Sequence, residues 1–489
     1  MQIYTPDWVK HAVFYQIFPD RFAGRSHPSI PSHVQWEPWQ APPTLQGYKG
    51  GNLWGIIDRL DYLVDLGITA LYLTPIFQSA CNHRYHTHDY YQVDPILGGN
   101  EALTALLTAA HDRQIKVVLD GVFNHASRGF FFFNDILENG PYSPWVDWFR
   151  VEGWPVAAYQ GNQPANYLGW SGNRALPQFN HDHPDVREYI MRIAEYWVEQ
   201  GIDGWRLDVP NEIKVPGFWQ EFRDRVKAIN PEAYIVGEIW DNAQPWLTGD
   251  QFDGVMNYQF RQACIAFTAG HRVDLAYTTQ PAYAPSPALQ APDYDQRIQD
   301  LLSWYPWDIQ LTQLNLLSSH DTARLLSMVH MDYSSVELAT LLLFTFPGAP
   351  CIYYGDEVGL PGGIDPDCRR SFPDKQDWHL ELQTVHKQLI QIRHAHPALR
   401  MGQYQGLYAK DQVYIFSRFL DENRLIVAIN CGSDAVSTPL DLSLLPYPIS
   451  RVEVLYGNAS TAHSTTSISK NLIDFHLPAR QGSILLVSA

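Results

Sequence analysis

The sequence predicts an α/β protein, a (β/α)₈ TIM barrel with an inserted subdomain after its third strand and a C-terminal antiparallel β-sandwich. Eight short runs that are apolar on both faces begin near residues 12, 68, 116, 204, 233, 254, 312 and 349. Such runs are typical of a parallel sheet covered by helices. Stretches with helical periodicity lie between them, at 54–66, 100–114, 184–200 and 336–346. No glycine-rich GxGxxG turn follows any run, which counts against an open dinucleotide-binding sheet.

The alternation of runs and helices is interrupted once and then ends. Residues 126–180 are rich in Gly, Asn, Pro, Trp and Tyr and show little helical periodicity. This interval is too long for a simple loop, so it predicts a small subdomain on the barrel face where active sites lie. From residue 401, short β-rich segments separated by turn residues predict the sandwich. We therefore expect a barrel at 1–125 and 181–400, an insertion at 126–180 and a sandwich at 401–489.

The composition restricts the class of ligand. The net charge is −18, from 34 Lys and Arg against 52 Asp and Glu. Such a charge repels nucleic acid and anionic membranes, so we predict neither as a partner. Aromatic residues make up 13% of the chain and suit both large cores and sugar binding.

The cellular location is also suggested by the sequence. The five cysteines are scattered without a CxxC pair, which argues against a disulfide framework or a cysteine zinc site. The N-terminus has no secretion-signal pattern, so a cytoplasmic location is expected. The uncharged run at 338–354 contains Pro347 and Gly348, and it predicts a buried helix, a turn and a strand rather than a membrane span.

Polar residues stand at the ends of several predicted strands. Their segments are KVVLDGVFNH, GWRLDVPNE, YIVGEIW and NLLSSHDTAR, which present Asp120, Asn124, His125, Arg206, Asp208, Glu238, His320, Asp321 and Arg324. The ends of parallel barrel strands meet at one face, so carboxylates that are distant in the sequence are expected to converge there.

Three clustered carboxylates suit glycoside cleavage, which needs a nucleophile and a proton donor. Arg206 lies two residues before Asp208, on the same strand face, and should keep that carboxylate ionised. Glu238 has apolar neighbours that should raise its pKa and keep it protonated, and Asp321 would bind sugar hydroxyls or support the transition state. Buried acids also cap helices or pair with arginine, but three at successive barrel strands favour catalysis.

These segments resemble a known family. DGVFNH (120–125), GWRLDV (204–209), GEIW (237–240) and SSHD (318–321) resemble, in order and separation, the conserved regions of the α-amylase family, glycoside hydrolase family 13. The segments that resemble its neopullulanase, cyclomaltodextrinase and maltogenic amylase group are 82–95, 176–180, 208–212, 237–258 and 362–372. The resemblance runs from about residue 10 to the C-terminus. Members of this group usually carry an N-terminal β-domain, which this chain is expected to lack.

The resemblance implies a retaining double displacement. Asp208 would attack the anomeric carbon, Glu238 would protonate the departing oxygen, and Asp321 would stabilise the transition state. Tyr85 would stack under the reacting sugar, Asp365 and Arg369 would hold sugars toward the non-reducing side, and Trp240 with Asn211 and Glu212 would line the leaving-group side. With Asp120 and Arg324 from the strand ends, the substrate-binding set is His83, Tyr85, Asp120, His125, Arg206, Asn211, Glu212, Trp240, His320, Arg324, Asp365 and Arg369.

The expected function is that of a retaining α-glucan hydrolase. The expected targets are α-1,4 bonds, or also α-1,6 bonds, in maltooligosaccharides, cyclomaltodextrins, pullulan or starch, with or without transglycosylation. An exo-acting α-glucosidase or an oligosaccharide transglycosylase is the alternative, and a non-enzymatic glucan-binding barrel is a remote third. Asp241 stands where the group usually has His, and Pro210 where it often has Ala, so the linkage preference is not transferred.

No cofactor is expected for the chemistry. His83, His86 and His88 form HxxHxH, but in an extended segment only residues 86 and 88 share a face, so no metal site is predicted. Asn124 matches a residue that binds calcium in many α-amylases, and a structural calcium ion is compatible with the resemblance. An α-glucan is the only partner expected, and the sequence specifies no oligomeric state.

Overall fold

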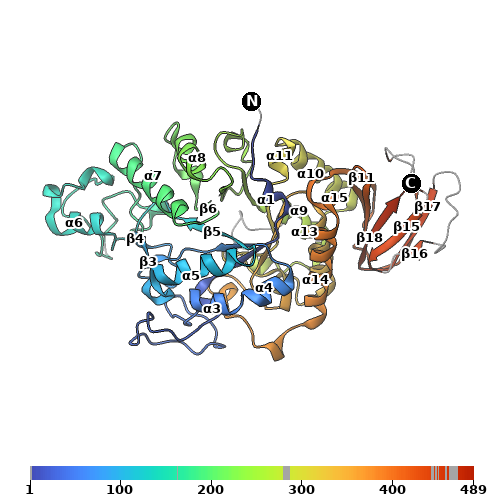
Figure 1. Ribbon diagram of the computed structural model, residues 1–489, viewed down its shortest axis with the longest axis horizontal. Helices are drawn as coiled ribbons and strands as arrows, with labels where there is room; N and C mark the ends of the chain where they lie inside the picture. The colour runs from blue at the N-terminus through green and yellow to red at the C-terminus, as the bar shows by residue number, and fades with distance from the viewer. Residues whose placement is uncertain are drawn as a thin grey trace.

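The protein is built around a closed eight-stranded parallel barrel, as predicted (Figure 1). The computed structural model describes residues 3–161, 163–278, 287–441, 445, 449, 451–457, 460–461 and 472–488. The barrel strands are β1 (Phe14–Ile17), β2 (Ala70–Leu73), β5 (Lys116–Gly121), β6 (Gly204–Leu207), β7 (Tyr234–Gly237), β8 (Gly254–Asn257), β9 (Leu314–Leu316) and β10 (Ala349–Tyr353). All eight strands coincide with the apolar runs of the sequence.

Helices cover the outside of the barrel. They include α3 (Leu53–Asp58), α4 (Leu60–Leu66), α5 (Gly99–His111), α7 (Pro184–Glu199), α8 (Phe218–Ile229), α9 (Tyr258–Thr268), α10 (Ala291–Ser303), α13 (Tyr333–Thr345) and α14 (Leu380–Ala395). The stretch expected as one helix at 54–66 is two helices separated at Arg59. No helix in the described part of the chain is both long and apolar enough to cross a membrane.

The barrel interior is a packed core. Seven of its eight strands, all but β6, contribute to a separate apolar cluster that includes Phe14, Tyr72, Val236, Met256 and Leu314. Outside the strands, a larger cluster joins the barrel to its helices. Because both faces of each strand are buried, the strands read as continuous apolar runs rather than alternating ones. The ends of the strands and the loops that follow them are therefore where polar groups can meet a ligand.

The segment after β5 differs from the expectation in one respect. It contains a regular helix, α6 (Phe131–Asn139), within the interval that shows little helical periodicity. The sequence FFFNDILEN begins with three aromatic residues, so no clear apolar stripe is visible, and the helix is stabilised instead by aromatic packing: Phe132 stacks on Trp145 and Phe133 packs against Phe149. Isolated bridges, among them His125 to Gln178, tie the segment back to the barrel.

A short antiparallel hairpin that the sequence did not predict precedes α5. Its strands are β3 (Phe77–Ser79) and β4 (Thr87–Val93), with Ser79 paired to Thr87. The hairpin follows β2 at the same end of the barrel as the segment after β5. It carries residues 80–86 as its connecting loop.

The C-terminal part is antiparallel β-structure. One sheet has the order β11-β12-β13-β18-β15 and the other β14-β17-β16, and a separate apolar cluster lies between strands of both. The strands are β11 (Gln403–Lys410), β12 (Val413–Leu420), β13 (Asn423–Asn430), β14 (Val436–Asp441), β15 (Arg451–Tyr456), β16 (Ser460–Thr461), β17 (Leu472–Leu477) and β18 (Gln481–Ser488). Figure 1 places these strands at the opposite end of the molecule from α6.

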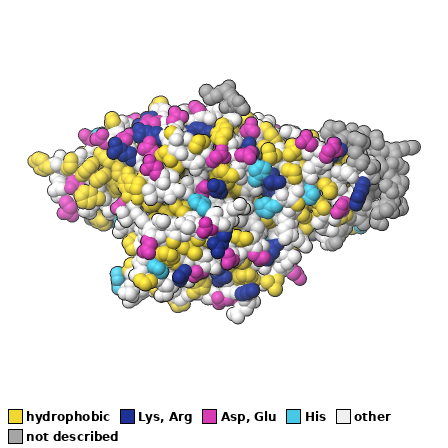
Figure 2. All heavy atoms as spheres, viewed as in Figure 1, with side chains coloured by type: hydrophobic (Ala, Val, Ile, Leu, Met, Phe, Trp, Pro, Cys, Tyr) yellow, Lys and Arg dark blue, Asp and Glu magenta, His cyan; other side chains and the backbone are white. Residues whose placement is uncertain are grey.

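The visible surface has an uneven distribution of apolar side chains. Figure 2 shows acidic and basic side chains intermixed over much of the face, whereas hydrophobic ones gather at the end that carries α6. Phe131, Tyr142, Trp154 and Tyr159 of that segment are among the exposed large hydrophobic residues.

Candidate active site

Three carboxyl groups of the expected site, the catalytic Asp208 and Glu238 and the substrate-binding Asp120, stand at one end of adjacent barrel strands. Asp120 lies near the end of β5, Asp208 directly follows β6, and Glu238 directly follows β7. The strand register pairs Leu207 with Gly237, and the backbone pairing continues beyond the strands, with Glu238 N–H donating to the Leu207 carbonyl at 2.9 Å. The backbone hydrogen bonds between the strands thus fix the positions of the Cα atoms that carry these carboxyl side chains.

Arg206 links three of the carboxyl groups. It is fully buried, and its Nη1 lies 2.9 Å from Asp120 Oδ1 and 3.1 Å from Asp208 Oδ1. Its Nη2 lies 2.8 Å from Glu238 Oε2. The sequence indicated the contact with Asp208 but not the contact with Glu238. One guanidinium group therefore holds the expected nucleophile and the expected proton donor side by side.

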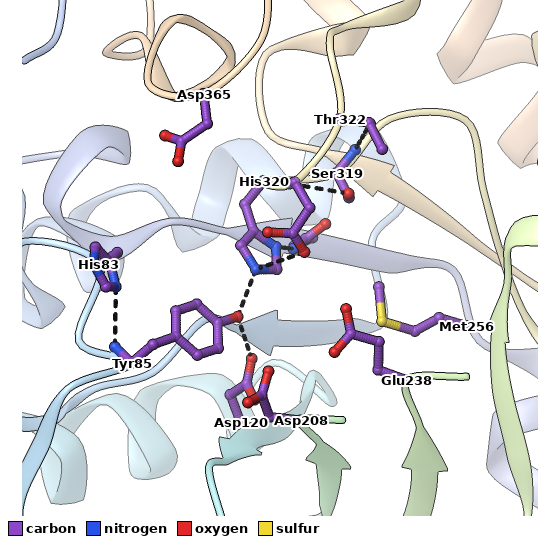
Figure 3. A network of polar contacts seen from close by, with 12 residues as sticks. His83, Tyr85, Asp120, Asp208, Glu238, Met256, Ser319, His320, Thr322 and Asp365 are labelled. Carbon is purple, nitrogen blue, oxygen red and sulfur yellow. Dashed lines mark hydrogen bonds and ion pairs between the residues drawn. The ribbon is translucent and has the colours of Figure 1, made fainter. Parts of the chain in front are cut away.

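Tyr85 and His320 form the other side of the site (Figure 3). The Tyr85 hydroxyl donates to Asp120 Oδ2 at 2.9 Å and lies 2.5 Å from His320 Nε2, and the two rings are stacked with an angle of 6° between them. Gln16 Nε2 lies 2.8 Å from His320 Nδ1. Since the Gln amide nitrogen only donates, His320 Nδ1 accepts and Nε2 carries the proton. That N–H faces Asp321 Oδ2 at 3.1 Å.

Asp321 is held from two sides. Besides His320, Arg369 Nη2 lies 3.7 Å from Asp321 Oδ1, and Arg369 Nη1 lies 3.0 Å from Asp365 Oδ1. The Arg369 Nε also donates to the His320 carbonyl at 2.9 Å. The structure thus brings Asp321, His320, Asp365 and Arg369 together, as expected for one end of a sugar-binding site.

His125 has an unused polar atom. Its ring is almost fully buried and stacks on Trp170 of the segment after β5, with 5.3 Å between the ring centroids. Its Nε2 is buried without a hydrogen-bond partner in the described part of the chain. A buried polar atom of this kind costs free energy unless a ligand satisfies it. Burial lowers the pKa of His125 to about 3, so the imidazole is neutral.

The pKa values of the carboxyl groups are raised. Burial raises the pKa of Glu238 to about 7, and Arg206 opposes this rise. Burial and the neighbouring Glu238 raise the pKa of Asp208, again against Arg206, and burial raises the pKa of Asp321. Arg206 lowers the pKa of Asp208, in the direction the sequence predicts, but by less than burial raises it. Burial and the repulsion between the two carboxylates therefore both favour a proton on Glu238 while Asp208 is ionised.

The turn after Asp208 is strained. Val209 has φ 36° and ψ 50°, a left-handed conformation that costs a β-branched residue of the order of 1–3 kcal/mol. In this conformation its N–H donates to Glu238 Oε2 at 3.2 Å. The strained backbone of Val209 therefore holds the side chain of Glu238, the expected proton donor, in its orientation.

The residues expected on the leaving-group side lie around this turn. Asn211 and Glu212 belong to the short 3₁₀ helix Pro210–Glu212, in which Glu212 is exposed and Asn211 half-buried. The half-buried Trp240 stacks on Tyr258 with 3.4 Å between ring centroids. The roles of these three residues in binding the leaving group stay predictions.

Two residues of the expected substrate-binding set have supporting positions instead. Asp120 is fully occupied, because it accepts from Arg206, Tyr85 and, at 2.7 Å, Tyr72. Arg324 is fully buried and donates to the carbonyls of Tyr354 and Cys368 and to Asp356. Asp120 therefore positions Arg206 and Tyr85, and Arg324 holds the segment that follows β10. A polar residue at the end of a predicted strand can either support another side chain or face the ligand, and the sequence does not show which.

Three supporting residues were not predicted. Gln16 fixes the tautomer of His320, Tyr72 donates to Asp120, and Met256 Sδ accepts from Arg206 Nε at 3.4 Å. Each belongs to an apolar strand run. Nothing in such a run marks which position faces the site.

The residue matched to a calcium ligand does not have a calcium-like environment. Asn124 Oδ1 accepts from Gln178 Nε2 at 2.9 Å, and Asn124 Nδ2 lies 3.3 Å from His125 Nδ1. Calcium takes six to eight oxygen ligands, usually including carboxylates. The only group of three or more His, Cys, Asp or Glu ligands found among the described residues is elsewhere and consists of Cys81, His83 and His86.

A barrel that gathers carboxyl groups around one buried arginine, beside a stacked tyrosine, has the site of a glycoside hydrolase. The α-amylase catalytic domain matches residues 16–387 of this chain. The chain therefore belongs to the α-amylase family. The family match confirms the resemblance inferred from the conserved segments.

Relatives within the family agree with the expected group. A cyclomaltodextrinase of Geobacillus thermopakistaniensis is 42% identical over 445 residues, which are 90% of this chain and 72% of that protein. A crystal structure of a debranching enzyme from Nostoc punctiforme covers all of both chains at 62% identity with a TM-score of 0.92. The cyclic α-maltosyl-(1→6)-maltose hydrolase of Arthrobacter globiformis is 36% identical with a TM-score of 0.86, covering 99% of this chain and 100% of that one.

Proposed function

We propose that this protein is a retaining α-glucan hydrolase whose nucleophile is Asp208 and whose general acid/base is Glu238. The observation that carries the proposal is the contact of one buried guanidinium, Arg206, with both carboxyl groups. Retaining glycosidases hold their two carboxyl groups only ~5–5.5 Å apart, and a shared arginine is one way to enforce such proximity.

In the first step, an Asp208 oxygen forms a bond to the anomeric carbon while the glycosidic bond breaks. The proton of Glu238 moves to the departing oxygen. In the second step, Glu238 accepts a proton from water, and the water oxygen displaces Asp208 from the sugar. Glu238 regains its proton in each cycle, so acid and base are one residue.

The surrounding residues have separate tasks in this proposal. The Tyr85 ring forms an apolar platform for the reacting sugar, and His125 Nε2 and the Asp321 carboxyl group bind its hydroxyls. Arg206 stays protonated, because its pKa lies well above the ordinary value through Asp120 and Glu238, which outweigh its burial. It therefore stabilises the carboxylate of Asp208 as that group is displaced in the second step.

For the substrate, we propose short or cyclic maltodextrins cleaved at α-1,4 bonds, together with α-1,6 bonds at branch points. The relatives' names support both linkages, since they include a cyclomaltodextrinase and a debranching enzyme. The exo-acting α-glucosidase and the transglycosylase use the same catalytic groups and differ in their products. A cytoplasmic role with imported or stored glucans fits one relative, the intracellular maltogenic amylase of Bacillus subtilis.

A panel of substrates tests this proposal. β-Cyclodextrin, pullulan, soluble starch and maltotriose are each incubated with the protein and the products are separated by chromatography. We expect cyclodextrin or pullulan to be cleaved faster than starch. Release of glucose alone would indicate the α-glucosidase, longer products would indicate the transglycosylase, and binding without cleavage would indicate a non-enzymatic barrel.

Two variants tie the activity to the site. Asp208→Asn and Glu238→Gln preserve shape and remove one ionisable group each, and each is expected to lower turnover by about 10³-fold or more. Asp224→Asn, on the exposed face of α8, is the matched control and should retain full activity. Full activity in Asp208→Asn would overturn the assignment.

A further inference from the structure

The loop between β3 and β4 brings three metal-binding side chains together. The ligand atoms of Cys81, His83 and His86 all lie within 4.8 Å of one another. Cys81 Sγ lies 3.5 Å from His83 Nδ1, and the rings of His83 and His86 are 5.1 Å apart at an interplanar angle of 82°. The three are partly buried.

The spacing of these atoms suits a tetrahedral zinc ion. Zn²⁺ binds a thiolate sulfur at ~2.3 Å and an imidazole nitrogen at ~2.0–2.1 Å, so sulfur and nitrogen ligands of one ion are about 3.5 Å apart. The Cys81 to His83 separation already has this value. Three protein ligands leave a fourth position for water or another ligand, which distinguishes such a site from closed structural zinc sites.

The loop is held in this conformation by its other residues. Arg84 has φ 63°, a left-handed turn that places His83 next to His86, contrary to the alternation expected for an extended segment. Arg84 Nε donates to Asp94 at 2.8 Å, and Asn82 Nδ2 donates to the Gly47 carbonyl at 2.9 Å. Ser79 Oγ donates to the His86 carbonyl at 2.7 Å. The ligands are therefore preorganised, and a cation need not order the loop.

The same loop leads into the candidate active site. Tyr85 N–H donates to His83 Nδ1 at 3.2 Å, and the Tyr85 ring is the expected sugar platform (Figure 3). A cation on His83 Nδ1 would replace that hydrogen bond. His83 would then be fixed toward Cys81 rather than toward a sugar.

We propose that Cys81, His83 and His86 form a binding site for a thiophilic divalent cation such as Zn²⁺, and that its occupation hinders sugar binding beside Tyr85. The cation binding is independent of the activity, whereas the hindrance rests on the function proposed above. The other four cysteines are buried, whereas Cys81 is partly exposed.

Calorimetric titration of the chelator-treated protein with zinc sulfate tests the binding directly. We expect one ion per chain. Cys81→Ser and His86→Asn should each weaken binding by tenfold or more, at least the ~10–100-fold seen when a mere outer-shell partner of a metal site is lost. His88→Asn, two residues along the same hairpin and outside the cluster, is the matched control and should bind like the wild type. Thermal melting without metal checks that each variant is folded.

Two further readouts separate the possible outcomes. With Co²⁺ in place of Zn²⁺, we expect a sulfur-to-cobalt charge-transfer band that Cys81→Ser abolishes. Zinc should inhibit glucan cleavage by the wild type competitively and should inhibit Cys81→Ser much less. Equal zinc affinity in wild type and Cys81→Ser, or no binding at millimolar zinc, would overturn the site; zinc binding without inhibition would overturn only the hindrance.

Discussion

At the residue scale, the positions and pKa values of the catalytic carboxyl groups depend on their contacts with Arg206. Its two terminal nitrogens contact Asp120, Asp208 and Glu238, all of them buried. One positive charge does not compensate three buried carboxylates, and burial accordingly raises the pKa of Glu238 to about 7. A carboxyl group with this pKa is suited to act as a general acid near neutral pH.

The pH dependence of catalysis follows from Asp208 and Glu238. Glu238 must be protonated to act, and burial raises its pKa to about 7, so activity should fall as the pH rises through about 7. Asp208 must be ionised, so activity should also fall at acidic pH, below the lower apparent pKa of the pair. The profile of kcat/KM should therefore be bell-shaped with a basic limb near neutrality.

Glu238→Gln provides the check on the basic limb. With a glucosyl fluoride, whose leaving group needs no protonation, this variant should retain measurable cleavage and should lack the limb near pH 7. Persistence of the same limb in Glu238→Gln would assign the proton to another group.

At the element scale, the ends of the strands and the loops that follow them carry the function. Arg324 illustrates an element held by one side chain, since its guanidinium donates to two carbonyls and to Asp356, and stacks on Tyr353. The segment it holds includes Arg369, which contacts Asp321. The position of a catalytic carboxyl group thus depends on a residue that does not face the sugar.

Arg324→Ala should therefore lower the stability of the protein rather than directly remove a substrate contact. Removing Arg324 leaves the partly buried Asp356 and the carbonyls of Tyr354 and Cys368 without their donor, which should lower the unfolding free energy by a few kcal/mol, about 3. Arg324→Lys keeps the charge but loses the forked geometry, so its loss should be smaller. Denaturant melting measures both. A fully stable Arg324→Ala protein with altered KM would instead place Arg324 on the substrate.

The elements show which features the sequence could predict. All eight barrel strands were predictable because burial on both faces leaves continuous apolar runs. Helix α6 was not, because an exposed aromatic residue, Phe131, directly precedes the packed Phe132 and Phe133 and obscures the apolar stripe. The hairpin β3–β4 was missed because β3 has only three residues and the turn at Arg84 has no glycine to mark it.

At the scale of the whole molecule, the barrel brings together groups that are far apart in the sequence. The polar residues at strand ends were predictable because an apolar strand makes them conspicuous. The sequence did not show which of these residues support others and which face the ligand. Asp120 and Arg324 have supporting positions, and only the direction of their side chains in the folded protein reveals this. Gln16 and Met256 were invisible within their runs for the same reason.

Calcium should not contribute to the stability of the whole molecule. Asn124, the residue matched to a calcium ligand, uses its oxygen to accept a hydrogen bond from Gln178. We therefore expect the same calorimetric melting temperature with and without a calcium-selective chelator. A lower melting temperature in the chelator, restored by added calcium, would show a calcium site at another position.

The most direct test of the retaining mechanism is to trap its covalent intermediate. The Glu238→Gln protein is incubated with a fluorinated α-glucosyl fluoride, digested, and its peptides are analysed by mass spectrometry. We expect a sugar adduct on Asp208, and no adduct at that position in the Asp208→Asn protein. An adduct on Asp120 or Asp321, or no adduct together with products of inverted anomeric configuration, would contradict it.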